Sequence, residues 1–355
     1  MESMSDPTSA MSAMSEHDAT LEHDPTTRER VVVAGLGRAG LDHACAFAMH
    51  PSAQLAGLVE PRNELRRFMR GIGFTAPSET SLERWLEKHA CDSVVVCSPA
   101  AEALETIETA VKAGLGVLVH GLANMPGETA TRIQATLASS ERPVAAGAPV
   151  LFHPLFARAR RSGALSPERV SQVRASASVS RVFSPMADPG GRDVLDFLLA
   201  DLLLLLDASF GPVVAVKAKG QKLYADWFDE CQVEARFANG LKALIDASWS
   251  VPDYPSAAMV IECAGPEGRV IVSDDALEMD MASLQGRVVV SSEPSQLRYD
   301  SGDHAGVAEG FLRMLGGDPI ATSALSVTRA ANVARVVDAV RASIHADAEE
   351  REVQP

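Results

Sequence analysis

A short run near the start of the chain, from Val31 to Asp42, constrains the fold more than any other feature. Four apolar residues precede three glycines spaced as Gly-x-Gly-x-x-Gly, and a helical pattern follows. This order of strand, turn and helix is typical of a dinucleotide-binding unit. Gly35 makes the tight turn, Gly37 lets a pyrophosphate approach the backbone, and Gly40 lets helix and strand pack closely. The N-terminus of the helix then faces the phosphates.

An acidic residue follows at the spacing that such a unit requires. A second apolar strand, residues 54–59, ends at Glu60, twenty residues beyond Gly40. From that position a carboxylate hydrogen-bonds the adenosine ribose, which favours NAD. Arg62 either stacks on adenine and attracts a ribose phosphate, or is an ordinary exposed helix residue, so NADP stays open.

Strand and helix patterns alternate through the first half of the chain. Short connections between them imply a parallel sheet with helices on both faces, and a ligand at the carboxyl ends of the strands. Two further strands end at such positions, one before Ser98 and Pro99 and one at His120. The predicted cofactor contacts are therefore Gly35, Leu36, Gly37, Arg38, Ala39, Gly40, Glu60, Arg62, Ser98, Pro99 and His120.

The second half of the chain has a different pattern. From Val170 onward, short alternating runs meet at turns such as Asn239-Gly240, which is typical of antiparallel strands. Helices are expected at 194–210 and 323–346. We predict an α/β fold with a tail (1–28), a Rossmann dinucleotide-binding domain (29–148), an α+β substrate and oligomerisation domain with a large, mostly antiparallel open sheet (149–346), and a short tail (347–355).

Charge and hydropathy narrow the classes of partner and compartment. The net charge of −15 argues against nucleic acid or an anionic membrane as the main partner. The most apolar run, Leu202 to Leu206, is too short to span a bilayer, and residues 1–28 lack the apolar core of a signal peptide. Five scattered cysteines without a Cys-x-x-Cys pair indicate a reducing cytoplasm.

No metal site is expected from the sequence. The cysteines lack zinc-site spacing, and His17 and His23 in the tail have no partner spacing. Asp193, Asp196 and Asp201 do not share one helix face, because successive helical residues are rotated by about 100°.

The order of these pieces resembles the Gfo/Idh/MocA (glucose-fructose oxidoreductase, inositol dehydrogenase and rhizopine catabolism) family of NAD(P)-dependent oxidoreductases, over about residues 29–346. Ser98-Pro99 resembles the family's Thr-Pro after the fourth strand, and residues 113–119 resemble its Ala-Gly-Lys-His-Val-Leu-Val. Residues 229–240 resemble its sheet hairpin, and Phe311 with residues 317–319 resembles the end of its second domain. The resemblance implies bound NAD or NADP, a small-molecule substrate, and a homodimer or homotetramer formed through the open sheet.

The family's catalytic pattern is changed here. Its Glu-Lys-Pro after the fifth strand reads His120-Gly121-Leu122, so the lysine is absent, and the arginine of its Gly-His-x-x-Arg-Phe-x-Pro becomes Leu151. Its Asp-x-x-x-His pair falls on Phe197 and Asp201, or one residue earlier, and neither register contains the histidine. Each sugar hydroxyl buried without a partner costs about 1 to 3 kcal/mol. We therefore expect a nonsugar, largely apolar or heterocyclic substrate, and imine and biliverdin reductases of the wider fold depart from the same pattern.

Three residues are candidates for handling a proton. His120 ends the strand at the expected nicotinamide edge, although it suits a hydrogen bond to a neighbouring loop equally well. Asp201 is an acid if the surrounding leucines raise its pKa, or else it meets solvent or pairs with an arginine. His153 precedes Pro154 at a helix start, where a structural role is the alternative. The function is thus an NAD(P)-dependent oxidoreductase or, alternatively, a noncatalytic dinucleotide-binding sensor or auxiliary subunit.

Overall fold

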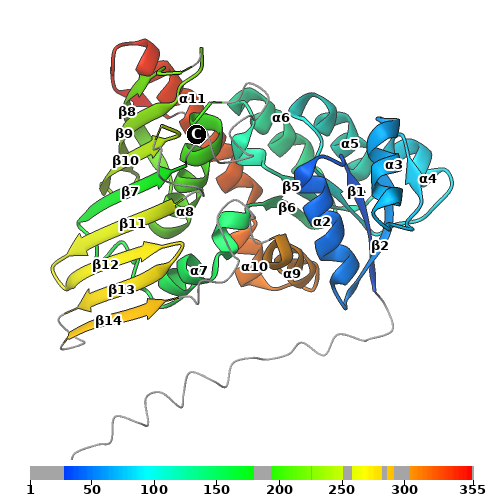
Figure 1. Cartoon of the computed structure of the whole chain (residues 1–355), viewed down its shortest axis with the longest axis horizontal. Coiled ribbons are helices and arrows are strands. Elements are labelled where there is room, and N and C mark those ends of the chain that lie inside the picture. The colour runs from blue at the N-terminus through cyan, green and yellow to red at the C-terminus, as the bar shows by residue number, and fades with distance from the viewer. Residues whose placement is uncertain are drawn as a thin grey trace, which may run out of the picture.

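The chain folds around two β-sheets with helices between and beside them (Figure 1). The structure is a computed structural model that describes residues 28–179, 193–224, 226–250, 258–281, 286–291 and 304–353. The α/β class and the two kinds of sheet predicted from the sequence are both confirmed. The predicted tail at 1–28 lies outside the described residues except for its last residue.

The first sheet is wholly parallel, with the strand order β3-β2-β1-β4-β5-β6. Chain order reverses between β1 and β4, and ligands of such sheets bind at the carboxyl ends of the strands beside that point. The Val-rich centre of the sheet is buried on both sides, as expected for parallel strands. Its strands are β1 (Glu29–Ala34), β2 (Ala53–Val59), β3 (Ser78–Glu79), β4 (Ser93–Val96), β5 (Gly116–His120) and β6 (Val144–Gly147).

Helices cover both faces of this sheet. Those from the first half of the chain are α2 (Arg38–Met49), α3 (Asn63–Gly71), α4 (Leu82–Leu86), α5 (Ala100–Lys112) and α6 (Gly127–Leu137). Two more come from near the end of the chain, α9 (His304–Leu315) and α10 (Pro319–Ala324). The ring of Phe311 in α9 meets that of Phe47 in α2 edge to face, with centroids 6.4 Å apart. The late helix α9 therefore packs beside α2 on the first sheet (Figure 1).

The second sheet is mixed but mostly antiparallel, in the order β14-β13-β12-β11-β7-β10-β9-β8-β15. Only β7 and β10 pair in parallel within its described part. Alternate residues are buried along the central strands, so one face packs inward and the other meets solvent. The strands are β7 (Gln172–Ser178), β8 (Val213–Gln221), β9 (Glu230–Phe237), β10 (Lys242–Ser248), β11 (Ala258–Gly265), β12 (Gly268–Ser273), β13 (Ala276–Met281), β14 (Gly286–Ser291) and β15 (Arg351–Glu352).

Helices join the two sheets. The helix α11 (Val327–His345) packs against β8 of the second sheet and α6 of the first, and α8 (Ala200–Phe210) packs against α11 (Figure 1). The shorter connecting elements are η1 (Leu122–Asn124), η2 (Pro149–Phe152) and α7 (Pro154–Arg161). None of the described helices combines the length and the apolarity needed to cross a membrane.

Three element boundaries differ from the sequence prediction. The helix expected at 194–210 begins with a π-helical turn, η3 (Leu195–Leu199), before α8. The helix expected at 323–346 starts at Val327, because Ser326 caps it by accepting a hydrogen bond from the Arg329 N–H. The tail expected at 347–355 is partly wrong, since β15 pairs with β8 at the sheet edge. A two-residue strand carries too little periodicity to be predicted.

Candidate functional site

The glycine turn after β1 has the geometry of a phosphate cradle. A Cβ on Gly40 would lie 1.8 Å from the carbonyl oxygen of Gly35, and one on Gly35 would lie 2.6 Å from the backbone nitrogen of Ser98. Gly35 also has a φ of +89°, a conformation that side chains disfavour. A Cβ on Gly37, by contrast, would meet nothing within 4 Å. Packing thus requires Gly35 and Gly40, whereas Gly37 keeps open the space where a ligand would approach the backbone.

The N-terminus of α2 suits an anion. No side chain caps the helix at Gly37, and no acidic residue occupies its first turn. The first N–H groups of a helix have no intrahelical partner, and together with the helix dipole they favour negative charge. Arg38 is exposed and Ala39 half-buried at this end. The N–H of Leu36 is engaged elsewhere, because it donates to the Glu60 carboxylate at 2.8 Å.

Glu60 is fully buried at the end of β2, beneath Arg62. Its carboxylate accepts hydrogen bonds from the backbone N–H of Arg62 at 2.9 Å and from the Arg62 Nε at 2.7 Å. Burial alone would raise the pKa of Glu60, but the bonds from Arg62 and Leu36 hold it below the usual value. The group is thus a carboxylate, and Arg62, whose side chain is 54% exposed, is paired with it.

Ser98 and Pro99 lie at the carboxyl end of β4, next to this turn. The backbone of Ser98 abuts Gly35, and Pro99 occupies the N-cap position of α5. The predicted residues from β1, β2 and β4 therefore meet at one edge of the sheet.

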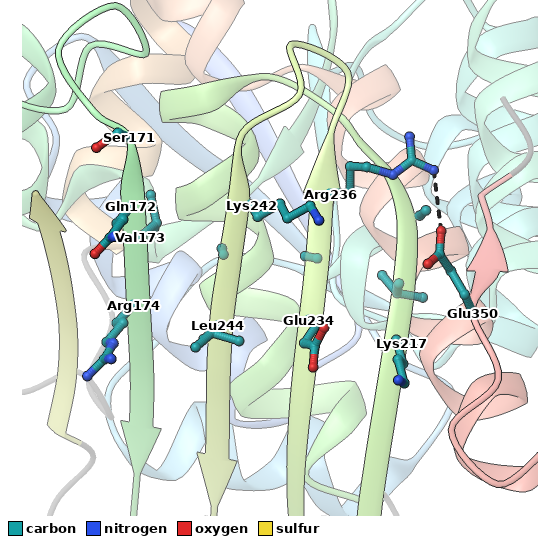
Figure 2. Close-up of a pocket in the computed structure, with 14 residues that line it drawn as sticks. Ser171, Gln172, Val173, Arg174, Lys217, Glu234, Arg236, Lys242, Leu244 and Glu350 are labelled. Atoms are coloured by element: carbon teal, nitrogen blue, oxygen red, sulfur yellow. Dashed lines mark ion pairs between the residues drawn. The ribbon is translucent and has the colours of Figure 1, made fainter. Parts of the chain in front are cut away.

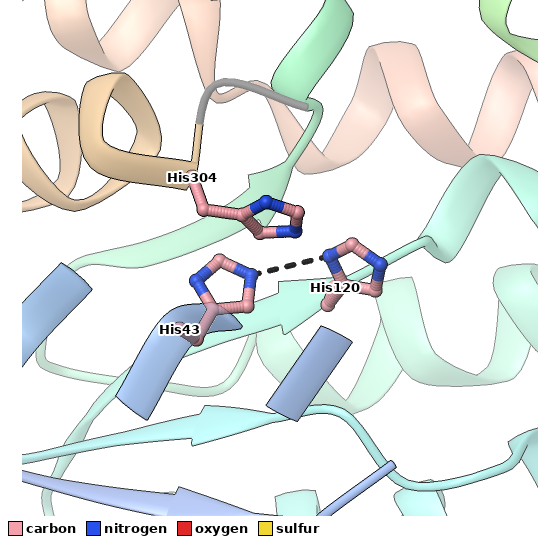
Figure 3. A group of neighbouring side chains, drawn as sticks. All are labelled: His43, His120 and His304. Carbon is pink, nitrogen blue, oxygen red and sulfur yellow. Dashed lines mark hydrogen bonds between the residues drawn. The ribbon is translucent and has the colours of Figure 1, made fainter. Parts of the chain in front are cut away.

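His120 ends β5 and lies within a cluster of three histidines (Figure 3). The other two are His43, in the second turn of α2, and His304, the first residue of α9. The Nε2 of His43 lies 3.2 Å from the Nδ1 of His120, at hydrogen-bonding distance. Ring centroids are 5.2 Å apart for that pair, 4.6 Å for His43 and His304, and 5.5 Å for His120 and His304.

The three rings differ in exposure. His43 is fully buried, whereas His120 and His304 are half-buried. Burial, with the two neighbouring imidazoles, lowers the pKa of His43 well below its usual value, so this ring is neutral. Sequence reasoning missed His43 and His304, because the three residues are far apart in the chain and meet only when α9 packs beside α2.

The other two candidate proton donors lie outside this cluster. Asp201 is half-buried in α8, and the η1 turn that follows His120 reaches that region through the Asn124 amide, which donates to the Asp196 carbonyl at 2.8 Å. His153 is buried at the start of α7, with its ring against that of Phe156 at 5.2 Å between centroids.

Asp193 and Asp196 have a structural partner. Arg341 of α11 forms an ion pair with Asp193 and donates to Asp196 at 2.8 Å. These two carboxylates therefore bind an arginine, a partner that sequence reasoning had offered only for Asp201.

Apart from Asp201, the replaced catalytic positions offer no polar side chain. Gly121 has a φ of +66° directly after β5, and Leu122 is buried in the core. Leu151, in η2, is buried as well. Phe197, in η3, packs partly buried against the same core. Hydrocarbon or no side chain thus stands where the resemblance places the family's lysine, arginine and, in one register, aspartate, whereas Asp201 puts a carboxylate at its histidine position.

The first domain matches the model of a known protein family. The model of an oxidoreductase family with an NAD-binding Rossmann fold matches residues 29–147. No curated protein matches the sequence.

Solved structures match almost the whole chain. GenD2 of gentamicin A biosynthesis, in complex with NAD, is 22% identical with a TM-score of 0.74, and the match covers 94% of this chain and 98% of that one. Levoglucosan dehydrogenase with NADH and levoglucosan is 18% identical, with a TM-score of 0.75 and coverage of 93% and 100%. UDP-N-acetylglucosamine 3-dehydrogenase from Acidithiobacillus ferrooxidans is 20% identical, with a TM-score of 0.74 and coverage of 91% and 99%. At these identities the similarity is one of fold.

Proposed function

We propose that the chain is an oxidoreductase of the Gfo/Idh/MocA family, whose model matches residues 29–147, and that it transfers a hydride between NAD(H) and a nonsugar, largely apolar or heterocyclic small molecule. The nicotinamide supplies the hydride chemistry when it is bound. The protein has to hold the dinucleotide, orient the substrate and handle one proton.

The residues for holding a dinucleotide are in place. The open space over Gly37 and the uncapped N-terminus of α2 suit a pyrophosphate. The ionised carboxylate of Glu60 suits the hydroxyls of an adenosine ribose, once the Arg62 side chain turns away from it. A carboxylate at this position repels a ribose phosphate, so NAD(H) is favoured over NADP(H).

The loss of polar side chains around the end of β5 carries the proposal for the substrate. Gly121 and Leu151 stand where the family's lysine and arginine would be, and Leu151 is buried. An apolar wall with few polar anchors is typical of small-molecule pockets. Levoglucosan dehydrogenase and the UDP-N-acetylglucosamine dehydrogenase act on sugars. We place the substrate of this chain in a different class.

His120 is the proposed proton donor, with Asp201 as the second candidate. The Nδ1 of His120 faces His43, and its Nε2 points away from that ring (Figure 3). If His43 donates from its Nε2, then His120 carries its own proton on Nε2, where it can be passed on.

Substrate profiling with NADH tests this proposal. We expect oxidation of NADH with cyclic imines or aryl ketones and none with inositols or aldoses. His120→Gln should lower kcat by about 100-fold or more, with a much smaller change in Kd for NADH. If Asp201→Asn lowers kcat and His120→Gln does not, the donor is Asp201. Turnover of polyols at rates above those of every apolar carbonyl or imine compound would refute the substrate class.

A noncatalytic sensor or auxiliary subunit is the second candidate function. The joint loss of a lysine, an arginine and a histidine at Gly121, Leu151 and Asp201 favours it. Under this proposal the protein binds NADH with micromolar or better affinity and oxidises none of the compounds that bind beside it. Any turnover that His120→Gln or Asp201→Asn abolishes would exclude it.

We also propose that the open face of the second sheet joins copies of the chain into a dimer or tetramer. Figure 2 shows this face, where Lys217 lies opposite Glu234 on the next strand and Leu244 follows beside it. Leu244 is 48% exposed among these charges. We expect Leu244→Glu to shift the mass measured by light scattering toward one chain. An unchanged mass, or a wild-type protein that is already monomeric, would contradict the proposal.

A further inference from the structure

Three imidazoles converge from distant parts of the chain at the edge of the first sheet. His43 lies on α2, His120 at the end of β5 and His304 at the start of α9 (Figure 3). One ring nitrogen of each lies within 4.8 Å of the corresponding nitrogen of both others. Among the described residues, no other group of three histidine, cysteine or acidic side chains has this compactness.

The spacing agrees with that of metal ligands. Zn–N bonds of about 2.0 to 2.1 Å in a tetrahedral site place two ligand nitrogens about 3.3 Å apart. The Nε2 of His43 and the Nδ1 of His120 are 3.2 Å apart. The ring nitrogen of His304 lies within 4.8 Å of both of these nitrogens. If it moved closer, all three nitrogens could bind one metal ion.

The orientation of the buried His43 ring also suits a bound metal ion. The side chain of His43 is fully buried, and within the described residues its one hydrogen bond joins a second imidazole, while its Nδ1 has no partner. A metal ion between the Nε2 of His43 and the Nδ1 of His120 would replace this imidazole–imidazole contact with two metal–nitrogen bonds.

We propose that His43, His120 and His304 bind a divalent transition metal ion, for which Zn²⁺ is the best match. Three neutral imidazoles suit zinc, cobalt, nickel or copper rather than magnesium or calcium, which prefer oxygen ligands. Three protein ligands leave a fourth position for water or another small ligand. This proposal does not depend on the proposed function. A metal bound here would connect α9 to the first sheet whether or not the chain is an enzyme.

The site has a consequence for His120. A metal on Nδ1 fixes the proton of that ring on Nε2, the nitrogen that points away from His43. This consequence rests on the proposed function, in which His120 passes a proton to the substrate.

Metal titration of the full-length, tag-free protein tests the site. After chelator treatment and desalting, we expect the protein to bind about one equivalent of Zn²⁺, counted by mass spectrometry of the metal. Bound Co²⁺ should show the visible absorption of a tetrahedral site. His304→Gln, which changes a half-buried residue, should weaken Zn²⁺ binding by at least about 100-fold. His43→Gln should do the same if its circular dichroism shows that it folds.

Matched controls separate this site from adventitious binding. His89→Gln changes an exposed histidine that lies against Trp85, and His17→Gln with His23→Gln changes the two in the first 28 residues. These variants should keep wild-type Zn²⁺ affinity. Equal affinity of His304→Gln and wild type, loss of binding in the control variants, or less than a tenth of an equivalent on the wild type would each overturn the site. NADH affinity, measured in parallel, should be unchanged in His304→Gln. A loss of metal binding can therefore be distinguished from a loss of dinucleotide binding.

Discussion

We expect the pairing of Glu60 with Arg62 to determine which dinucleotide the chain prefers, and Glu60→Gln tests this directly. Glutamine keeps the shape and an acceptor oxygen for the Leu36 N–H, which lies 2.8 Å from the carboxylate. It removes the negative charge that the Arg62 Nε contacts at 2.7 Å. Its amide NH2 faces the Arg62 backbone N–H that donates to the other carboxylate oxygen at 2.9 Å, so circular dichroism and a melting curve have to show first that the variant folds.

The magnitude follows from the kind of hydrogen bond that is lost. Bonds to a charged group contribute about 1.5 to 3 kcal/mol and neutral ones about 0.5 to 1.5 kcal/mol, so the ribose contact weakens by about 1 to 1.5 kcal/mol. This corresponds to a Kd for NADH about 5- to 12-fold higher. Affinity for NADPH should rise, because Arg62 is released from its carboxylate and the repulsion of a ribose phosphate disappears.

Fluorescence titration of the wild type, Glu60→Gln and the double variant Glu60→Gln/Arg62→Ala with NADH and NADPH measures both effects. The double variant should lose the gained affinity for NADPH. Glu64→Gln removes an exposed carboxylate from the first turn of the same helix, α3, and serves as the matched control. An unchanged ratio of the two Kd values in Glu60→Gln, or the same change in Glu64→Gln, would refute the role of Glu60.

Three further predictions concern stability and the glycine turn. Gly40→Ala should unfold at a lower temperature and lose NADH binding, because its Cβ would collide with the Gly35 carbonyl. Gly37→Ala should keep its melting temperature and bind NADH at least 10-fold more weakly. Equal melting temperatures of the two variants would contradict this. Asp318→Ala should lower the free energy of unfolding by about 1 kcal/mol in urea titrations, because this side chain caps α10; no change would exclude the cap. Burial raises the pKa of Asp274 to about 6, so its folded form holds a proton more tightly than its unfolded form, and the stability this gives at low pH is lost as pH rises from about 4 to 6. Asp274→Asn, which keeps an acceptor for the Met259 N–H, should therefore be about 1 to 2 kcal/mol more stable than wild type at pH 7 and equal to it at pH 4; equal stability at both pH values would refute the shift.

The dinucleotide cradle was predictable because its signals are local. Gly35, Gly37 and Gly40 occupy one turn. Glu60 follows at the spacing expected when the next strand, β2, returns to pair with β1. Alternation of residues likewise predicted the second sheet, since its exposed face leaves a period of two in the sequence.

The histidine cluster was not predictable, because it depends on packing between distant elements. The apolar stripe of α9, including Phe311, predicts a helix but does not say which sheet that helix covers. Contact of Phe311 with Phe47 places His304 next to His43, and no spacing in the sequence reports this contact. The π-helical start of η3 and the short β15 were missed for a related reason, since both are set by local fit to neighbouring elements.

Native mass spectrometry of the freshly purified protein tests the central claim most directly, which is that this chain holds a nicotinamide dinucleotide at the glycine turn. We predict one dinucleotide per chain, retained on purification or taken up from added NADH, and absent from Gly37→Asp, whose side chain would fill the open space over the turn. Denaturation of the same sample would release any second, apolar molecule for identification. A wild-type protein that carries no dinucleotide and takes up neither added NAD(H) nor added NADP(H) would contradict the account.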